Sequence, residues 1–361
     1  MTGARLPLTL LTGFLGAGKT TLLNAVLSGA GRGRIAVIVN EFGAAGLDHD
    51  LIEAADEEVV LMQSGCLCCS VRGDLARTIS DLIARRDAGG LTFERVVIET
   101  TGLADPGPIL QTLRVDPILA QSTQLDGVVC VADAANGPAT LDAQFEAVSQ
   151  AAMADLIVLS KADLVPASQT QAFEARLRSI NPGARILRAD RGTGVAGQLW
   201  GLSGHRVGVT PANVLAWTTG PDAAPDPLAN LSGFASSDSA PAPVSPHDAR
   251  IGTASIVLDD PIPDRVFDIW LDTLIALRGP DILRVKGIVF LEDMDVPFVF
   301  HGVQHVFDPP VPLPGWPGGD RRSRIVVIAR DLTRSELQRS LDMLRARLSP
   351  REAENLQKET S

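Results

Sequence analysis

The sequence predicts an α/β domain with a mainly parallel sheet, followed by a smaller α+β domain. Three observations indicate this fold class. A glycine-rich loop lies between an early apolar strand and a helix, further apolar strands alternate with helices to about residue 202, and a separate set of strands and helices begins near residue 251. Continuous apolar strands that alternate with helices are typical of a parallel sheet covered on both faces. The 361 residues are enough for two domains.

The early loop has the composition of a phosphate-binding loop (P-loop). Residues 13–21 read GFLGAGKTT, after an expected strand at 6–12 and before an expected helix at 22–27. The glycines allow backbone N–H groups to wrap a phosphate chain, and the helix start adds the positive end of its dipole. Lys19 is expected to reach the β and γ phosphates, and the Thr20 hydroxyl to bind Mg²⁺. The first domain is therefore expected to be a P-loop NTPase, with nucleotide-binding residues Gly13, Gly16, Ala17, Gly18, Lys19, Thr20 and Thr21.

An acid at the end of a later strand is expected to complete the phosphate site. Residues 95–102 read RVVIETTG, an apolar strand that ends in an acid and is followed by glycine, which is the pattern of a Walker B segment. Glu99 is expected to hold a Mg²⁺-bound water or to orient the attacking water. The N–H of Gly102 is expected to meet the γ-phosphate, so that its loop senses hydrolysis. The predicted catalytic residues are Lys19, Thr20 and Glu99, of which Thr20 and Glu99 serve Mg²⁺.

A third motif predicts the base that is bound. An apolar strand at 154–159 is followed by Ser160, Lys161 and Asp163. In guanine-nucleotide proteins a strand end of the form Asn/Thr-Lys-x-Asp holds the base. The carboxylate of Asp163 could accept from both guanine N1–H and the exocyclic amine, a donor pair that adenine lacks. The motif therefore favours GTP, although Ser160 replaces the usual Asn.

The other elements follow from apolar periodicity. Further strands of the first domain are expected at 34–40, 59–62, 126–133 and 184–187, and helices at about 73–86 and 194–202. In the second domain, strands are expected at 253–258, 282–290, 297–306 and 323–328, and helices at 263–277 and 332–348. The last helix opens on Thr333 with Glu336 three residues later, a capping-box pattern. The predicted divisions are 1–202 for the P-loop domain, 203–250 for a Pro/Ala/Ser-rich linker, 251–348 for the second domain and 349–361 for a polar tail.

The cysteines indicate metal chemistry. Three of the four cysteines, Cys66, Cys68 and Cys69, lie between a strand end and a helix start, and so tight a cluster cannot be a set of fold-stapling disulfides. Two or three thiolates facing one ion suit Zn²⁺, or Co²⁺ of similar geometry. A redox sensor remains an alternative use of the cluster. The fourth, Cys130, lies in an apolar strand and is expected to be a small core residue.

Composition excludes some partners. The net charge of −11 and the lack of basic runs indicate that the chain does not bind nucleic acid. No apolar stretch is long enough to span a bilayer, so no membrane partner is expected. The first residues lack the apolar region of a signal peptide, and the expected location is therefore cytoplasmic.

Taken together, the motifs resemble those of the CobW-like metallochaperone GTPases, relatives of the urease and hydrogenase maturation GTPases. The segments that carry the resemblance are Gly13 to Thr20, Asn40 to Gly43, Cys66 to Cys69, Glu99 to Pro106 and Ser160 to Asp163. The segments 282–289 and 323–328 also look like strands of that family's C-terminal domain. The resemblance therefore covers nearly the whole chain, and its Cys-x-Cys-Cys element is highly specific to the family.

The resemblance implies GTP hydrolysis coupled to the loading or transfer of a transition metal. It implies GTP/GDP and Mg²⁺ as cofactors and a client metalloprotein as partner. The thiolates favour Zn²⁺ as the metal, with Co²⁺ next, and a homodimer is left open. Glu41 would lie in a nucleotide-responsive loop beside the metal thiolates. Two departures matter: many relatives have Glu where this chain has Ala44, and many carry a histidine-rich stretch where this chain has only His247.

Two alternatives stay open at this point. One is a P-loop kinase or ATPase acting on a small substrate, which the unusual Ser160 allows and Asp163 disfavours. The other is a redox-responsive nucleotide-binding protein in which the cysteine cluster is the sensor. Guanine selectivity tests the first alternative, and metal binding under reducing conditions tests the second.

Overall fold

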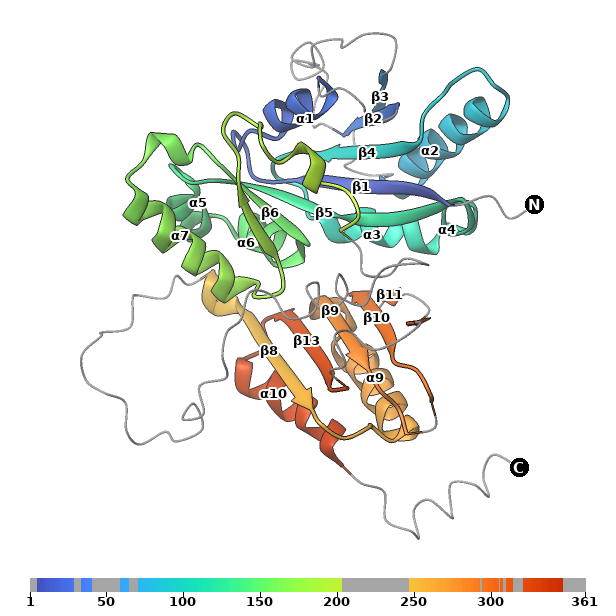
Figure 1. Ribbon diagram of the computed structural model, residues 1–361, viewed down its shortest axis with the longest axis vertical. Helices are drawn as coiled ribbons and strands as arrows, with labels where there is room; N and C mark the ends of the chain where they lie inside the picture. Colours follow the sequence, from blue (N-terminus) through green and yellow to red (C-terminus); the bar gives the residue numbers. More distant parts are fainter. Residues whose placement is uncertain are drawn as a thin grey trace.

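The protein consists of two sheets, each with its own helices (Figure 1). The computed structural model describes residues 5–28, 34–40, 59–64, 71–202, 247–292, 294–304, 306–307, 310–313 and 321–346. The predicted fold class is confirmed: a parallel P-loop domain precedes a smaller α+β domain. Among the described residues, no helix is both long and apolar enough to cross a membrane.

The first sheet has seven parallel strands in the order β3-β2-β4-β1-β5-β6-β7. The strands are β1 (Leu6–Thr12), β2 (Ile35–Asn40), β3 (Val59–Ser64), β4 (Arg95–Thr100), β5 (Thr123–Asp133), β6 (Leu156–Ser160) and β7 (Arg185–Arg188). The helices are α1 (Lys19–Leu27), α2 (Val71–Asp87), α3 (Pro106–Val115), α4 (Pro117–Ser122), α5 (Gly137–Ala143), α6 (Phe145–Met153) and α7 (Ala167–Ile180). Because all strands run the same way, the loops that carry the predicted motifs leave the sheet at one edge.

Both faces of this sheet are buried, and alternate residues of a strand pack on opposite sides. Leu10 and Ile98 belong to the core that α2, α3, α6 and α7 cover, whereas Leu11 and Val97 pack with α1. Side chains of a strand alternate between faces, so a continuous apolar run buries both of them. The apolar runs in the sequence are explained by this double burial. Cys130 is part of the first core, as predicted, and burial raises the pKa of its thiol to about 12.

The prediction of a helix at 194–202 is wrong. This segment contains only a short 3-10 turn, Ala196–Gln198, and its ends are glycines with left-handed backbones, Gly194 (φ 82°) and Gly201 (φ 72°). Val195 and Leu199 are nevertheless buried against the α1 face of the sheet. The apolar spacing therefore marked a buried face correctly, but glycine conformations prevent a continuous helix there.

The second sheet has six strands in the order β11-β10-β9-β13-β8, with β12 paired to β10, and every pair is antiparallel. The elements are β8 (Ile251–Leu258), α9 (Asp264–Arg278), β9 (Ile282–Val289), β10 (Phe298–Val303), β11 (Val306–Phe307), β12 (Val311–Pro312), β13 (Ser323–Arg330) and α10 (Arg334–Asp342). α9 and α10 cover one face of this sheet, where Phe267 packs edge-on against Phe300 at 5.2 Å.

Two predicted elements of the second domain are shorter than expected. The strand predicted at 297–306 ends at Val303, because Gln304 takes a left-handed backbone (φ 56°) and the chain turns back to pair β11 with β10. The helix predicted at 332–348 becomes a 3-10 turn after Asp342. Its predicted capping box is confirmed: Thr333 Oγ1 accepts from the Glu336 N–H at 3.2 Å, and Glu336 accepts from the Thr333 N–H at 2.7 Å.

The other face of the second sheet lies against the first domain. Leu283, Val303 and Ile328 belong to the same buried core as α3, α6 and α7. β8 starts beside α7 (Figure 1), where Thr253 donates a hydrogen bond to the Ile180 carbonyl at 3.0 Å. Within the expected linker, residues 247–250 form a turn, whose Asp248 pairs with Arg176 at 2.6 Å. The two domains therefore share buried apolar and polar contacts.

Candidate functional site

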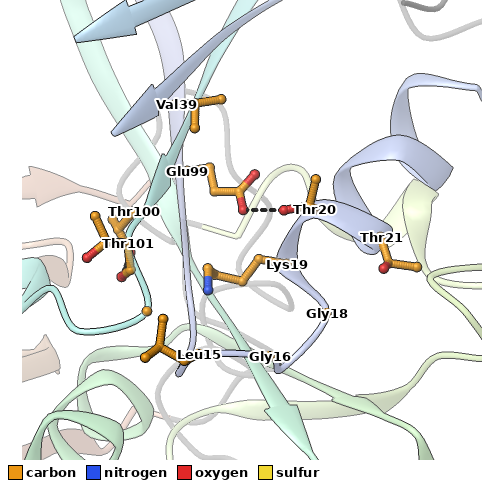
Figure 2. A pocket seen from close by; sticks show the side chains of 11 residues that line it. Leu15, Gly16, Gly18, Lys19, Thr20, Thr21, Val39, Glu99, Thr100 and Thr101 are labelled. Atoms are coloured by element: carbon orange, nitrogen blue, oxygen red, sulfur yellow. Dashed lines mark hydrogen bonds between the residues drawn. The ribbon is translucent and has the colours of Figure 1, made fainter. Parts of the chain in front are cut away.

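The P-loop lines a cavity of about 240 Å³ at the carboxyl edge of the first sheet (Figure 2). The loop leaves β1 at Thr12, and α1 begins at Lys19. Gly18 precedes the helix with a left-handed backbone (φ 98°), a conformation that a side chain would strain. The N-terminus of α1 therefore opens into the cavity, an arrangement that favours an anion.

Thr20 and Glu99 meet at one side of this cavity. The Thr20 hydroxyl donates to the Glu99 carboxylate at 2.9 Å, and Glu99 is 3% exposed (Figure 2). A hydroxyl and a carboxylate oxygen beside a polar cavity fit the oxygen ligands that Mg²⁺ takes. Mg²⁺ bound there would supply positive charge to the phosphate oxygens of a nucleotide. The Lys19 ammonium donates to the Phe14 carbonyl at 3.3 Å, on the same loop.

The segment after β4 passes directly over the P-loop. Gly102 lines the cavity, and a Cβ at this position would lie 2.5 Å from the Leu15 nitrogen. Only glycine permits so close an approach between the two backbones. The backbone of Gly102 therefore lies where a nucleotide phosphate in the P-loop would be within reach.

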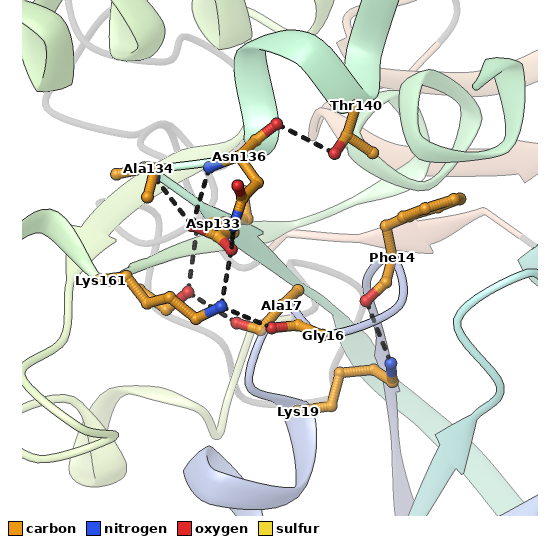
Figure 3. Close-up of polar contacts among 12 residues, drawn as sticks. Phe14, Gly16, Ala17, Lys19, Asp133, Ala134, Asn136, Thr140 and Lys161 are labelled. Carbon is orange, nitrogen blue, oxygen red and sulfur yellow. Dashed lines mark hydrogen bonds and ion pairs between the residues drawn. The ribbon is translucent and has the colours of Figure 1, made fainter. Parts of the chain in front are cut away.

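The predicted base motif also lies against the P-loop (Figure 3). Ser160 Oγ donates to the Ala17 carbonyl at 2.6 Å, and Lys161 Nζ donates to the Gly16 carbonyl at 2.8 Å. Asp163 follows in a short 3-10 turn, and its side chain is exposed. Ser160, which stands where the motif usually has Asn, thus binds the loop through its hydroxyl.

Sequence reasoning missed Asp133, which holds the lysine of this motif. Asp133 ends β5 and pairs with Lys161 Nζ at 2.7 Å (Figure 3). Burial would raise the pKa of Asp133, but hydrogen bonds from Lys161 and Asn136 outweigh it and keep the pKa of this carboxyl below its ordinary value. An acid at the carboxyl end of an apolar strand was the signal in the sequence, the same one that identified Glu99.

The predicted nucleotide residues divide into those that face the cavity and those that support the loop. The cavity is lined by Gly16, Gly18, Lys19, Thr20, Thr21, Glu99 and Gly102, together with Thr100 and Thr101, which were not predicted. Gly13 and Ala17 are buried beneath the loop, and a Cβ on Gly13 would lie 2.4 Å from the Val131 carbonyl oxygen. Gly13 therefore lets the loop pack on β5, whereas Ala17 belongs to the core beneath α1.

The predicted transition-metal residues, Glu41, Cys66, Cys68 and Cys69, lie outside the described residues. The strands from which their loops depart are described. Asn40, the last residue of β2, is the register partner of Ser64 in β3 and of Thr100 in β4. Among the described residues, no cluster of three or more His, Cys, Asp or Glu could hold a metal ion.

Comparison with known proteins gives similarity over both domains. Residues 7–188 match the family described as CobW/HypB/UreG, nucleotide-binding domain, and residues 251–345 match the cobalamin synthesis protein cobW C-terminal domain. The zinc chaperone YjiA of Escherichia coli (strain K12) is 31% identical over 337 residues, which cover 93% of this chain and 98% of that protein.

Two further similarities involve GTPases. The zinc-regulated GTPase metalloprotein activator 1 of Schizosaccharomyces pombe is 35% identical over 193 residues, which cover 52% of this chain and 46% of that protein. The crystal structure of Zn(II)-bound YjiA GTPase from E. coli has a TM-score of 0.72 at 27% identity and covers 95% of this chain and 100% of that one. The arrangement of both domains is thus similar to that of a solved structure.

Proposed function

The chain belongs to the CobW/HypB/UreG family, and on that premise we propose that it is a GTP-hydrolysing metallochaperone that binds Zn²⁺ and transfers it to a client metalloprotein. It is a P-loop GTPase. The proposed cargo site consists of Cys66, Cys68 and Cys69, with Glu41 beside it. Zn²⁺ is favoured over Co²⁺ because similar proteins are named zinc chaperones.

The proposed nucleotide site uses the cavity at the P-loop. Lys19 and the N-terminus of α1 would bind the phosphates, and the pair Thr20 and Glu99 would hold Mg²⁺. Asp163 is exposed and would accept two hydrogen bonds from guanine. Lys161 is fixed by Gly16 and Asp133, so its stem has a defined position along which a base could lie.

The register of three neighbouring strands carries the proposal that nucleotide and metal are coupled. Asn40 lies between its partners Ser64 and Thr100 at the carboxyl edge. Glu41 is the next residue after Asn40, Cys66 comes two residues after Ser64, and Gly102 two residues after Thr100. The three segments proposed to meet cargo metal and γ-phosphate therefore start side by side, so movement of one would affect the others.

Thiolate chemistry also supports a proposed location. Metal binding needs reduced cysteines, and we therefore propose that the protein works in the cytosol. A client is part of the same proposal, since transfer of a metal requires an acceptor; a homodimer stays an open prediction. Binding of a client could then depend on whether GTP and metal are present.

The experiment for this coupling is a competition titration of Zn²⁺ and Co²⁺ against a chelator, with a non-hydrolysable GTP analogue or with GDP. Metal should bind more tightly with the analogue and Mg²⁺, by roughly 5–150-fold, because coupling between sites is typically about 1–3 kcal/mol. Affinity should also fall below about pH 7, since thiols must lose protons to bind. Equal affinities in the two nucleotide states would contradict the switch.

Matched variants locate the cargo site. Cys66→Ser/Cys68→Ser should lose tight binding. Cys130→Ala should keep it, because Cys130 is buried in the core and the pKa of its thiol is raised to about 12. Unchanged affinity in the double variant would rule out the cluster as the site, and reversible disulfide formation without metal binding would favour the redox alternative.

Guanine selection has its own test. Asp163→Asn should lose much of its preference for GTP over xanthosine triphosphate, because an amide can donate to the xanthine oxygen. Turnover of both nucleotides by both proteins is the measurement. Hydrolysis of ATP and GTP at equal rates by the wild-type protein would overturn the base assignment and favour an ATPase or kinase.

A further inference from the structure

A single glutamine side chain holds the segment that crosses the P-loop. Gln150 lies on α6 and has no exposed surface. Its Nε2 donates to the Gly102 carbonyl at 3.1 Å and to the Ala104 carbonyl at 3.0 Å. Both donor positions of the amide are thus used on one short segment, residues 102–104, which follows the proposed Mg²⁺ ligand Glu99 by three residues.

These two bonds determine how the segment faces the nucleotide cavity. Each peptide group is planar, so fixing a carbonyl also fixes the N–H of the next residue. Gln150 therefore orients the peptide planes Gly102–Leu103 and Ala104–Asp105. The P-loop confines the same segment, because the backbone of Gly102 packs so closely on Leu15 that a Cβ would not fit between them. Its conformation is set by the P-loop on one side and by Gln150 on the other.

The helix that carries Gln150 is itself firmly anchored. α6 ends at Met153, whose carbonyl accepts from Arg284 of β9. Two residues later, Asp155 pairs with Lys286 at 2.9 Å. Asn181 also donates to the carbonyls of Ala151, Ala152 and Ala154. A side chain on a rigid support can hold its partners in one geometry.

We propose that Gln150 is a positioning residue that keeps the Gly102 segment ready for the γ-phosphate. It does not touch the nucleotide; it acts through the backbone of residues 102–104. This inference rests on the proposed function, because it assumes that a γ-phosphate occupies the cavity beside Gly102. GDP lacks that phosphate, so loss of Gln150 should affect binding of GTP and leave binding of GDP unchanged.

The test compares two variants that each remove a buried amide from α6 or its surroundings. Gln150→Met keeps a similar volume and removes both donors, whereas Asn181→Leu removes the donors at the far end of α6. Gln150→Met should weaken a non-hydrolysable GTP analogue about tenfold and GDP by less than about twofold, as expected from losing two neutral hydrogen bonds. Asn181→Leu should leave the affinities for the analogue and for GDP unchanged, although both variants lower the melting temperature.

A pH profile separates positioning from packing. In Gln150→Glu, a buried carboxylate would face two carbonyl oxygens, which favours its protonated form. Protonation restores one donor, so affinity for the analogue should recover as the pH falls from about 8 to about 5.5 relative to Gln150→Met. GDP affinity should show no such recovery. A flat profile equal to that of Gln150→Met would overturn the proposal.

Amide hydrogen exchange at residues 102–105 of the nucleotide-free protein tests whether Gln150 restrains this segment when no nucleotide is bound. Exchange at these amides should be faster in Gln150→Met than in Asn181→Leu when each variant is measured equally far below its own melting temperature. Equal exchange in the two variants, or equal weakening of the analogue and GDP, would overturn the proposal. If the wild-type protein bound no GTP analogue but the exchange difference appeared, the proposed function would be wrong, whereas the restraint of residues 102–104 by Gln150 would be supported.

Discussion

Two buried acids at opposite edges of the first sheet have different surroundings. Glu99 lies at the carboxyl end of β4, faces an open cavity and accepts a hydrogen bond from the neutral Thr20 hydroxyl. Asp155 directly precedes β6, at the amino edge, and is enclosed by Arg284 and Lys286 of the second domain. Both are nearly inaccessible, at 3% and 4% exposed, so burial alone does not distinguish them.

The difference lies in what borders each carboxylate. Burial would raise the pKa of Asp155, but Arg284 and Lys286 outweigh it, and the pKa of the carboxyl is lowered. The negative charge of Asp155 is therefore neutralised by side chains of the protein itself. At Glu99 the fold leaves space beside the carboxylate, which suits a cation that comes and goes. The carboxyl edge is thus arranged for reversible binding, and the amino edge for holding the two domains together.

The largest expected effect is on stability, from Asp155→Asn. Removing this charge leaves Arg284 and Lys286 buried without a counter-ion, and breaking a buried pair in this way costs about 3–5 kcal/mol. Asp331→Asn is the matched control, because Asp331 pairs with Arg250 at 2.8 Å on the surface and should cost less than about 1 kcal/mol. Urea denaturation measures both. A loss at Asp155 no larger than the control would mean that the charges do not hold the domains together.

The next effect is on turnover, from Glu99→Gln. The amide can keep the contact with Thr20 but lacks the charge that Mg²⁺ requires, so turnover should fall about 100-fold. The free energy of unfolding should change by less than about 1 kcal/mol, since the amide has the same shape as the carboxylate and borders a cavity. A large loss of stability with little loss of GTPase activity would reverse the assignment of the two edges. Lys19→Ala should behave like Glu99→Gln in both measurements.

The smallest effect is a pH dependence. Burial, followed by the neighbouring Arg284, lowers the pKa of Lys286 from 10.5 to about 8 despite the opposing charge of Asp155; the His301 side chain also interacts with Asp155. The unfolded chain holds this proton up to a pH near 10.5, so folding releases it between about 8 and 10.5. Stability should therefore rise with pH in this window.

Lys286→Met should remove this rise. Because Cys130 and other groups titrate in the same range, the informative quantity is the difference in slope between wild type and variant. Denaturation curves at several pH values give that slope. Parallel slopes would show that Lys286 keeps its proton, and the amino edge would then hold two fixed positive charges throughout.

Local patterns in the sequence identified most elements near the nucleotide site. The glycine loop, the acid after β4 and the motif after β6 each depend on a few adjacent residues, and strand-loop-helix geometry follows from them. The capping box at Thr333 is equally local and was predicted correctly. Two errors came from backbone turns within apolar patterns, at Gly194 and Gln304, where apolar spacing continues although the chain changes direction. The third was the end of the last helix, which becomes a 3-10 turn after Asp342.

The sequence by itself thus determined the fold class, the P-loop with Lys19 and Thr20, and the acid Glu99, because glycine content, charge and apolar periodicity act over a few residues. Only the tertiary structure identified the ion pair of Asp133 with Lys161, the hydrogen bond of Gln150 to Gly102 and the ion pair of Arg284 with Asp155. These partners lie 28, 48 and 129 positions apart in the chain. Strand order, helix packing and the contact between domains bring them together, and no local pattern carries that information.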